Sequence, residues 1–211
     1  MDTSLFILTR TNDAFIDVIL SNSSAACAGI IVSLTLDGSI INQDDNLNGL
    51  IACTIADVPD DLKSEILFDF MHKTIGDALD EGHGNLIAVC KENNLSECLE
   101  EMSGGSVIEK PIDIPSLLND DRMFEKNTTS VAIKSYVSLI KSMINHDGIT
   151  FVSTTGKILA YHYIVNNNKV ESVQVVGGSR TKAFEALKNV SGIYACFFKS
   201  QDGLTKFHCN G

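Results

Sequence analysis

The stretch DGITFVSTTGKILAYHYIV, Asp147–Val165, predicts two β-strands joined by a tight turn. Apolar and β-branched residues fill both arms, and Thr155-Gly156 between them is a turn sequence. A helix is predicted just before it, over Ser130–His146 with Thr128 or Thr129 as the cap, because apolar residues recur there at helical spacing. This part of the chain therefore predicts a sheet with a helix packed beside it.

The residues that follow continue the same mixed pattern. A third strand is predicted in SVQVVG (172–177), a helix in SRTKAFEALKN (179–189), and two more strands in GIYACFFKS (192–200) and LTKFHC (204–209). The order is helix, three strands, helix, two strands. We expect an α/β (α+β) fold in which a mixed central β-sheet is flanked by helices.

Residues 1–126 are predicted to form an acidic α/β region, and residues 127–211 a separate C-terminal domain. The boundary is placed in the polar stretch LLNDDRMFEKN (117–127). Upstream of it we expect strands at 29–36, 49–56 and 84–90, a helix from Asp60 or Asp61 to about Asp80, a short helix in LSECLEEM (95–102), and an extended edge segment in SVIEKPIDIP (106–115).

Charge separates the chain into an acidic and a mildly basic part. Residues 1–126 hold 7 Lys+Arg and 23 Asp+Glu, giving −16, whereas residues 127–211 hold 9 and 4, giving +5. The total of −11 argues against a broad nucleic-acid-binding surface. The basic part can still hold one compact anion.

Composition and cysteine usage indicate a cytoplasmic protein that binds no membrane. No apolar run approaches the ~20 residues that span a bilayer, and the N-terminus lacks the basic and apolar segments of a signal peptide. The 6 cysteines are scattered, without a CxxC pair or zinc-finger spacing. We expect them to be free thiols in a reducing compartment.

A glycine-rich turn before the second predicted helix is the first candidate site. It consists of Gly177, Gly178, Ser179, Arg180, Thr181 and Lys182. Glycines allow close approach of a ligand, a helix N-terminus attracts anions, and Arg180 and Lys182 add positive charge. These groups suit a phosphate, although the turn matches neither the P-loop nor the GxGxxG pattern. The alternative is an ordinary strand-to-helix connection with Ser179 as the N-cap.

Asp147-Gly148 is the second candidate site, because it lies where the predicted helix gives way to a strand. A carboxylate in this position can hold a divalent metal that neutralises phosphate charge, or it can activate a hydroxyl. The alternative is a plain Asp-Gly turn, which is the commonest use of this dipeptide.

Taken together, HDGITFVSTTGKILA (146–160), GGSRTKAFEAL (177–187) and FFKSQDGLTKF (197–207) resemble the nucleotide-binding domain of diadenylate cyclases, the DisA N-terminal or DAC family. That family carries Asp-Gly-Ala, then Gly-Thr-Arg-His-Arg-Ala-Ala, then a serine at a strand end. The resemblance covers about residues 130–208. The upstream EGHGNLIAVCKENN (81–94) is similar to the His-Gly-Gly region of sensor-like relatives, with Asn85 in place of the second glycine.

The resemblance implies a DAC-like C-terminal domain in which Asp147 holds Mg or Mn and Arg180 and Lys182 contact phosphate. Ligand contacts are also implied for Gly148, Gly177, Gly178, Ser179, Thr181 and Ser200. The chain departs from the family pattern in three places: Ile149 replaces Ala, Thr181 replaces His, and Lys182 replaces the second Arg. Catalysis in the family needs two ATP molecules brought face to face by two subunits, so the resemblance also implies a homo-oligomer.

These departures fall on groups that align phosphates for transfer, which depends on positioning. They favour a sensor-type protein of bacterial signalling that binds ATP or a related adenine nucleotide, including a cyclic dinucleotide. The first alternative is an active diadenylate cyclase, a nucleotidyltransferase that condenses two ATP into cyclic di-AMP with a divalent metal. The second alternative is a ligand-free interaction module whose acidic first half binds a partner.

Overall fold

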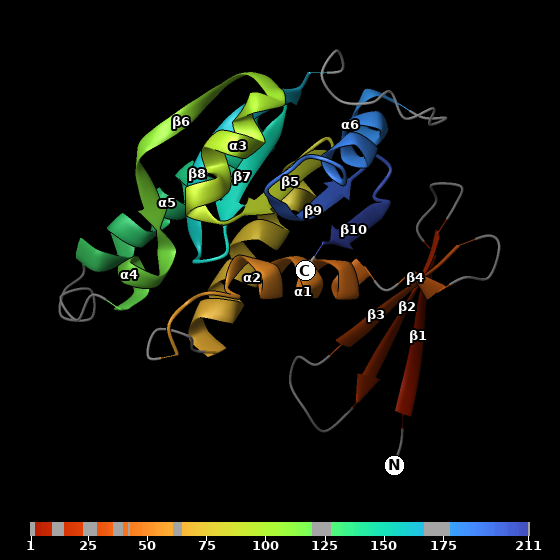
Figure 1. Cartoon of the computed structure of the whole chain (residues 1–211). Helices are drawn as coiled ribbons and strands as arrows, with labels where there is room; N and C mark the ends of the chain where they lie inside the picture. Colours follow the sequence, from red (N-terminus) through yellow and green to blue (C-terminus); the bar gives the residue numbers. More distant parts are fainter. Residues whose placement is uncertain are drawn as a thin grey trace. The chain divides into compact units, whose positions relative to one another are not determined.

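The computed structural model describes residues 3–9, 15–22, 29–35, 40–41, 43–60, 65–119, 128–166 and 178–210. The chain divides into two compact units, Met1–Asn46 and Leu47–Gly211. Figure 1 shows the elements of each unit. The candidate site residues all belong to the second unit.

The first unit is a four-stranded antiparallel sheet. Its strands are β1 (Thr3–Thr9), β2 (Phe15–Asn22), β3 (Gly29–Thr35) and β4 (Ile40–Ile41), hydrogen-bonded in that order. The strand predicted over residues 29–36 is confirmed as β3. Each connection joins neighbouring strands, so the unit is a simple meander.

The second unit is built on a six-stranded mixed sheet with the order β10-β9-β5-β7-β8-β6. The strands are β5 (Asn85–Cys90), β6 (Met102–Asp113), β7 (Ile149–Ser153), β8 (Lys157–Val165), β9 (Ile193–Lys199) and β10 (Thr205–Cys209). β5 and β7 pair in parallel, and the other pairs are antiparallel. The expected mixed sheet flanked by helices is therefore confirmed.

Helices cover both faces of this sheet (Figure 1). The helices are α1 (Gln43–Thr54), α2 (Glu65–Glu81), α3 (Leu95–Glu100), α4 (Ile114–Asn119), α5 (Thr128–Asn145) and α6 (Ser179–Leu187), with a 3-10 turn at Glu92–Asn94. Buried side chains of α1, α2, α4 and α5 share one core cluster, and those of α3 and α6 share another. The unit thus has three layers, helix–sheet–helix.

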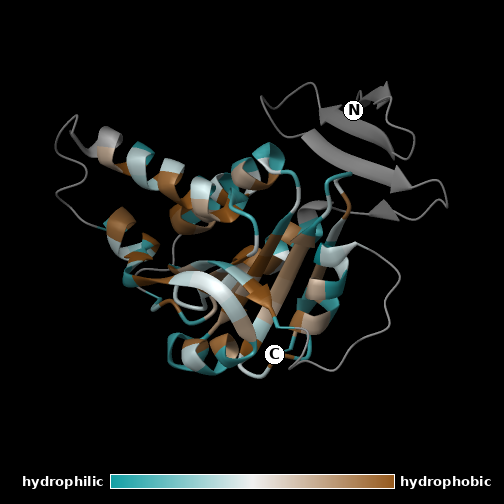
Figure 2. Cartoon of the chain, turned by 90° about the horizontal axis from the view of Figure 1, so that it is seen from above, coloured by the Kyte–Doolittle hydropathy of each residue, from teal (hydrophilic) through white to brown (hydrophobic). Residues whose placement is uncertain are grey.

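The strand β5 shows how the sequence specifies these layers. Ile87 and Val89 belong to the first cluster, whereas Leu86 and Ala88 belong to the second, because successive side chains point to opposite faces of a sheet. Both faces are covered, so the whole strand is buried, and every residue after Asn85 is apolar. Figure 2 shows the hydrophobic colour gathered on the central strands of the second unit.

Most local predictions in the C-terminal half are confirmed. The hairpin appears as β7 and β8, the two later strands as β9 and β10, and the two helices as α5 and α6. The extended segment with Pro111 is part of β6, which lies at an edge of the sheet as expected for a strand that contains proline. The strand predicted over residues 172–177 lies outside the described residues.

The strand predicted over residues 49–56 is wrong, because this segment lies mostly within α1. Leu50, Ile51 and Thr54 are buried on one face while Ala52 is exposed, a helical spacing that a short apolar run conceals. The boundary predicted after residue 126 falls inside the second unit. The physical reason is the sheet itself, which takes β5 and β6 from before that residue and four strands from after it.

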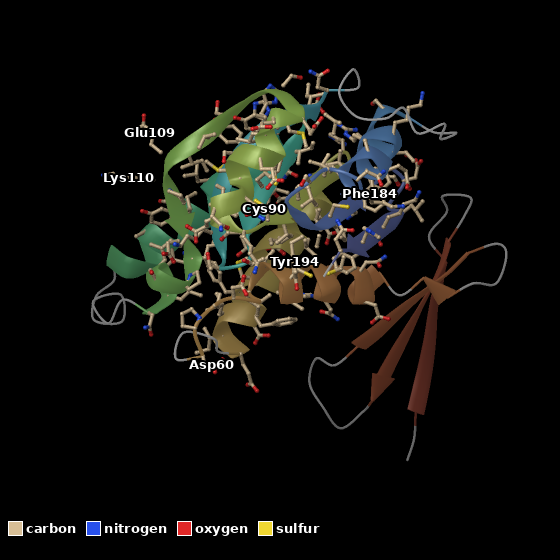
Figure 3. All side chains as sticks on the ribbon, viewed as in Figure 1. Asp60, Cys90, Glu109, Lys110, Phe184 and Tyr194 are labelled. Carbon is tan, nitrogen blue, oxygen red and sulfur yellow. The ribbon has the colours of Figure 1, made fainter. Side chains whose placement is uncertain are left out.

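Five cysteines of the described residues are free thiols, as expected, and four of them are buried. Figure 3 labels Cys90 among the packed side chains of the second unit, whereas Glu109 and Lys110 lie on the exposed β6. Burial raises the pKa of Cys196 to about 12, which keeps this thiol protonated and unreactive at neutral pH. Among the described helices, none is long and apolar enough to cross a membrane.

Replacing Ile87 with alanine should destabilise the second unit strongly. Ile87 is 0% exposed in the centre of β5, so the change leaves a cavity and should cost about 2–5 kcal/mol of unfolding free energy. Ile66→Ala on α2 is the matched control, because Ile66 is 66% exposed and its loss should cost less than about 0.5 kcal/mol. Urea denaturation followed by circular dichroism measures both values. Equal losses would contradict the layer assignment.

Candidate functional site

The topology of the sheet brings four sequence segments to one end of it. β5 and β7 are parallel, so the turns that precede them, His83-Gly84 and Asp147-Gly148, lie at the same end. β9 runs antiparallel to β5 with Lys199 opposite Asn85, which brings the turn starting at Ser200 to this end as well. The start of α6 joins them through Arg180.

Arg180 connects two of these turns through its guanidinium group. Its Nη1 donates a hydrogen bond of 3.1 Å to the carbonyl oxygen of His83. Its Nη2 donates one of 3.2 Å to Oδ1 of Asp147, which is also an ion pair. The residues predicted to bind metal and phosphate are therefore in direct contact.

The turn before β5 packs closely against Arg180. Gly84 has a φ of +107°, a left-handed conformation that favours glycine. A Cβ at this position would lie 3.2 Å from Nη1 of Arg180 and 3.2 Å from the carbonyl oxygen of Lys199. It would also lie 3.4 Å from the backbone nitrogen of Gln201. The positive φ favours glycine here, and the Arg180 side chain and the end of β9 would crowd a larger residue.

The Asp147-Gly148 turn is held by β8. Gly148 has a φ of +108°, and a Cβ there would lie 2.7 Å from the carbonyl oxygen of Tyr163. His162 has a φ of +64°, which is uncommon outside glycine, and its ring Nδ1 donates to the carbonyl oxygen of Asp147. His146 packs against the His162 ring, with ring centroids 4.3 Å apart. These backbone and ring contacts therefore fix the position of the Asp147 backbone, from which the carboxylate side chain extends.

Asn85 joins the turn before β5 to the end of α5. Its Nδ2 donates 2.9 Å hydrogen bonds to the carbonyl oxygen of Ile144 and to Oδ1 of Asn145. The side chain is buried, and its Oδ1 has no hydrogen-bond partner within the described residues. A Cβ at Gly82 would clash with this amide at 2.6 Å. Asn85 thus satisfies one backbone carbonyl group at the end of α5, which lies two residues before Asp147.

The first turn of α6 presents the remaining predicted phosphate ligands. Gly178 is the N-cap, not Ser179, which is the first helical residue. Gly178 has no side chain to cap the first N–H groups of the helix, so they are suited to an anion. Ser179 and Lys182 are exposed, and Thr181 is partly buried. Gly177 lies outside the described residues.

Ser200 closes its own turn. Its hydroxyl oxygen accepts a hydrogen bond of 2.9 Å from the backbone N–H of Leu204, and its N–H donates to the Leu204 carbonyl oxygen at 2.8 Å. The hydroxyl proton remains able to donate to a ligand. The position fits the predicted binding role, but the observed bonds give Ser200 a structural role that is sufficient by itself.

A divalent cation at this site could use the carboxylate of Asp147, whose side chain is largely exposed. In the parts of the chain that the structure describes, no three His, Cys, Asp or Glu side chains converge as metal ligands. Mg²⁺ is often held by one or two carboxylates together with substrate phosphates. Within the described residues, the donor set therefore fits a cation that arrives with a nucleotide better than one held by protein groups alone. The expected Mg or Mn stays a prediction.

Two residues of the site carry no signal in the sequence. His162 lies in the middle of a predicted strand, where the pairing of β7 with β8 is irregular, and its ring reaches the carbonyl oxygen of Asp147. In the sequence, Asn85 is noted only because it stands in place of the second glycine of the His-Gly-Gly region. No local pattern predicts that its amide reaches α5. Both roles depend on contacts between segments distant in sequence.

Comparison with known proteins assigns the chain to no family. No protein-family model matches the chain, and no curated protein matches its sequence. The function proposed below therefore stands on the residues and their geometry.

Replacing Gly148 with alanine should destabilise the protein more than the same change at Gly203. Both glycines have positive φ, +108° and +89°, so alanine strains the backbone at each. Only at Gly148 would the new Cβ also meet backbone atoms, at 2.7 Å. We expect Gly203→Ala to cost about 1 kcal/mol and Gly148→Ala about 2–3 kcal/mol or more. Urea denaturation of the two variants compares them, and equal costs would show that the turn is not held against β8.

Proposed function

We propose that this protein is a nucleotide-binding protein of sensor type, which holds the phosphate of ATP or a related adenine nucleotide at the end of the sheet where Arg180 lies. The observation that supports this most strongly is the convergence on Arg180. Segments around residues 83, 147, 180 and 200 are far apart in sequence, yet they meet at one place. They are the same segments that resemble the diadenylate cyclase family.

The chemistry of this place suits a phosphate. The N-terminal N–H groups of α6 and the positive end of its dipole attract anions, and a guanidinium group binds phosphate oxygens through two parallel hydrogen bonds. The bond from Arg180 to His83 holds the guanidinium in place before a ligand arrives. A group that is already ordered loses less entropy on binding, which favours affinity.

The Arg180–Asp147 contact favours a sensor over a cyclase. Asp147 is the residue that would hold a metal ion and help to neutralise phosphate charge, but its carboxylate faces a guanidinium group 3.2 Å away. A metal ion would have to compete with this cation. Thr181 and Lys182 in addition replace two groups that the resembling family uses to align phosphates, so nucleotide binding without efficient transfer is the expected outcome.

Replacing Arg180 with alanine should weaken adenine-nucleotide binding at least about tenfold. The change removes charge-assisted hydrogen bonds, which are worth about 1.5–3 kcal/mol each. Isothermal titration calorimetry with ATP and with cyclic di-AMP measures the loss. Lys73→Ala is the matched control, because it removes one positive charge and one exposed ion pair, to Asp77, from α2. Equal affinities for the two variants would contradict the placement of the site.

The sensor and cyclase functions are separated by incubating the protein with ATP and Mn²⁺ and analysing the products by chromatography. We expect no cyclic di-AMP above the level seen with boiled protein. Formation of cyclic di-AMP that disappears in Asp147→Asn would show that the protein is a cyclase. Failure of every nucleotide to bind in calorimetry would contradict both functions.

A further inference from the structure

Asp147 and Arg180 form an ion pair inside the proposed phosphate site. The Asp147 side chain is 75% exposed and that of Arg180 is 40% exposed, so both groups remain accessible to a ligand. An exposed pair of this kind contributes little to stability. Its effect on the charge offered to a ligand is larger, because it places a carboxylate against the main phosphate-binding cation.

Two hydrogen bonds hold the Arg180 guanidinium group beside this carboxylate. Nη1 is held by the His83 carbonyl oxygen while Nη2 faces Asp147, and Gly84 packs against the same guanidinium group. The Asp147 backbone is in turn held by His162. A phosphate that binds Arg180, whether it displaces Asp147 from Nη2 or uses another N–H of the guanidinium, therefore comes close to the negative charge of Asp147.

We propose that Asp147 is a specificity-determining residue, which acts as an internal counter-ion of Arg180 and discriminates against highly charged phosphate ligands. The proposal rests on the function proposed above and deepens it by naming the ligand class. Repulsion from one carboxylate grows with the number of negative charges that the ligand brings near it. A phosphodiester carries one negative charge, a terminal phosphate up to two, and a free triphosphate more.

The rest of the charge distribution acts in the same direction. The chain carries a net charge of −11, which disfavours polyanions in general. Lys182 is exposed on the first turn of α6, and Lys199, which precedes Ser200, is already paired with Asp80 at 2.8 Å. With Arg180 and Lys199 both paired with carboxylates, part of the positive charge of the site is already compensated. The site is therefore better suited to phosphodiester-linked adenine nucleotides than to a free triphosphate.

Asp147→Asn tests this in metal-free buffer with EDTA, where no cation can mediate between carboxylate and phosphate. Asparagine keeps the size of the side chain and removes its charge. Calorimetry should show ATP binding about tenfold tighter than in the wild type and cyclic di-AMP binding about twofold tighter, as expected for removing one nearby charge from a more and a less charged ligand. The ratio of the two affinities is the decisive quantity.

Two further variants serve as controls for the charge effect. Asp77→Asn makes the same charge change in the exposed Lys73–Asp77 pair on α2 and should leave both affinities unchanged within about twofold. In the Arg180→Ala background, Asp147→Asn should raise ATP affinity by a smaller factor than in the wild type, because repulsion is still relieved but no guanidinium is freed from the carboxylate. A double-mutant cycle isolates this coupling.

The outcomes distinguish the two proposals. If wild-type protein binds a nucleotide through Arg180 but Asp147→Asn lowers ATP affinity, leaves it unchanged, or raises both affinities by one factor, the specificity proposal is overturned and the binding function stands. If neither wild type nor Asp147→Asn binds ATP or cyclic di-AMP, both proposals are overturned.

Discussion

The parallel pairing of β5 with β7 is the constraint on which the candidate site depends. Register pairs Leu86 with Ile149, so the turns before the two strands reach the same end of the sheet. The antiparallel strand β9 ends at the same end of the sheet, where its last residue, Lys199, lies opposite Asn85. Ligands of open parallel α/β sheets usually bind at the carboxyl ends of the strands, whereas this site lies at the amino ends of β5 and β7. Here the helix α6, and not a strand end, supplies the anion-binding N–H groups.

The same residues serve structure and binding at this place. Arg180 ties α6 to the turn before β5, Asn85 ties that turn to α5, and Gly148 allows the turn before β7 to pack against β8. Each contact is explicable as packing or hydrogen bonding alone. The exposure of the charged groups indicates more than packing. An ion pair as open to solvent as Asp147–Arg180 contributes little to stability.

Sequence reasoning succeeded where the signal is local. The hairpin of β7 and β8 follows from a turn sequence between two apolar arms, and α5 from periodic apolar residues. It failed at α1, because Leu50 and Ile51 lie in an apolar run too short for periodicity to separate helix from strand. It also placed a boundary after residue 126, because charge and polarity change there although the sheet continues across it. Surface charge reports on solvent exposure, not on which strands pair.

The sequence by itself determined the secondary structure of the described residues of the C-terminal half, the mixed α/β class, and the candidate residues Asp147, Gly148, Gly178 and Arg180, since each depends on neighbours within a few positions. Only the tertiary structure decided that Arg180 contacts Asp147 and His83, that Asn85 caps α5, and that His162 holds the Asp147 turn. These contacts join residues up to 97 positions apart. Strand pairing over such distances depends on packing of the whole sheet, which no local pattern records.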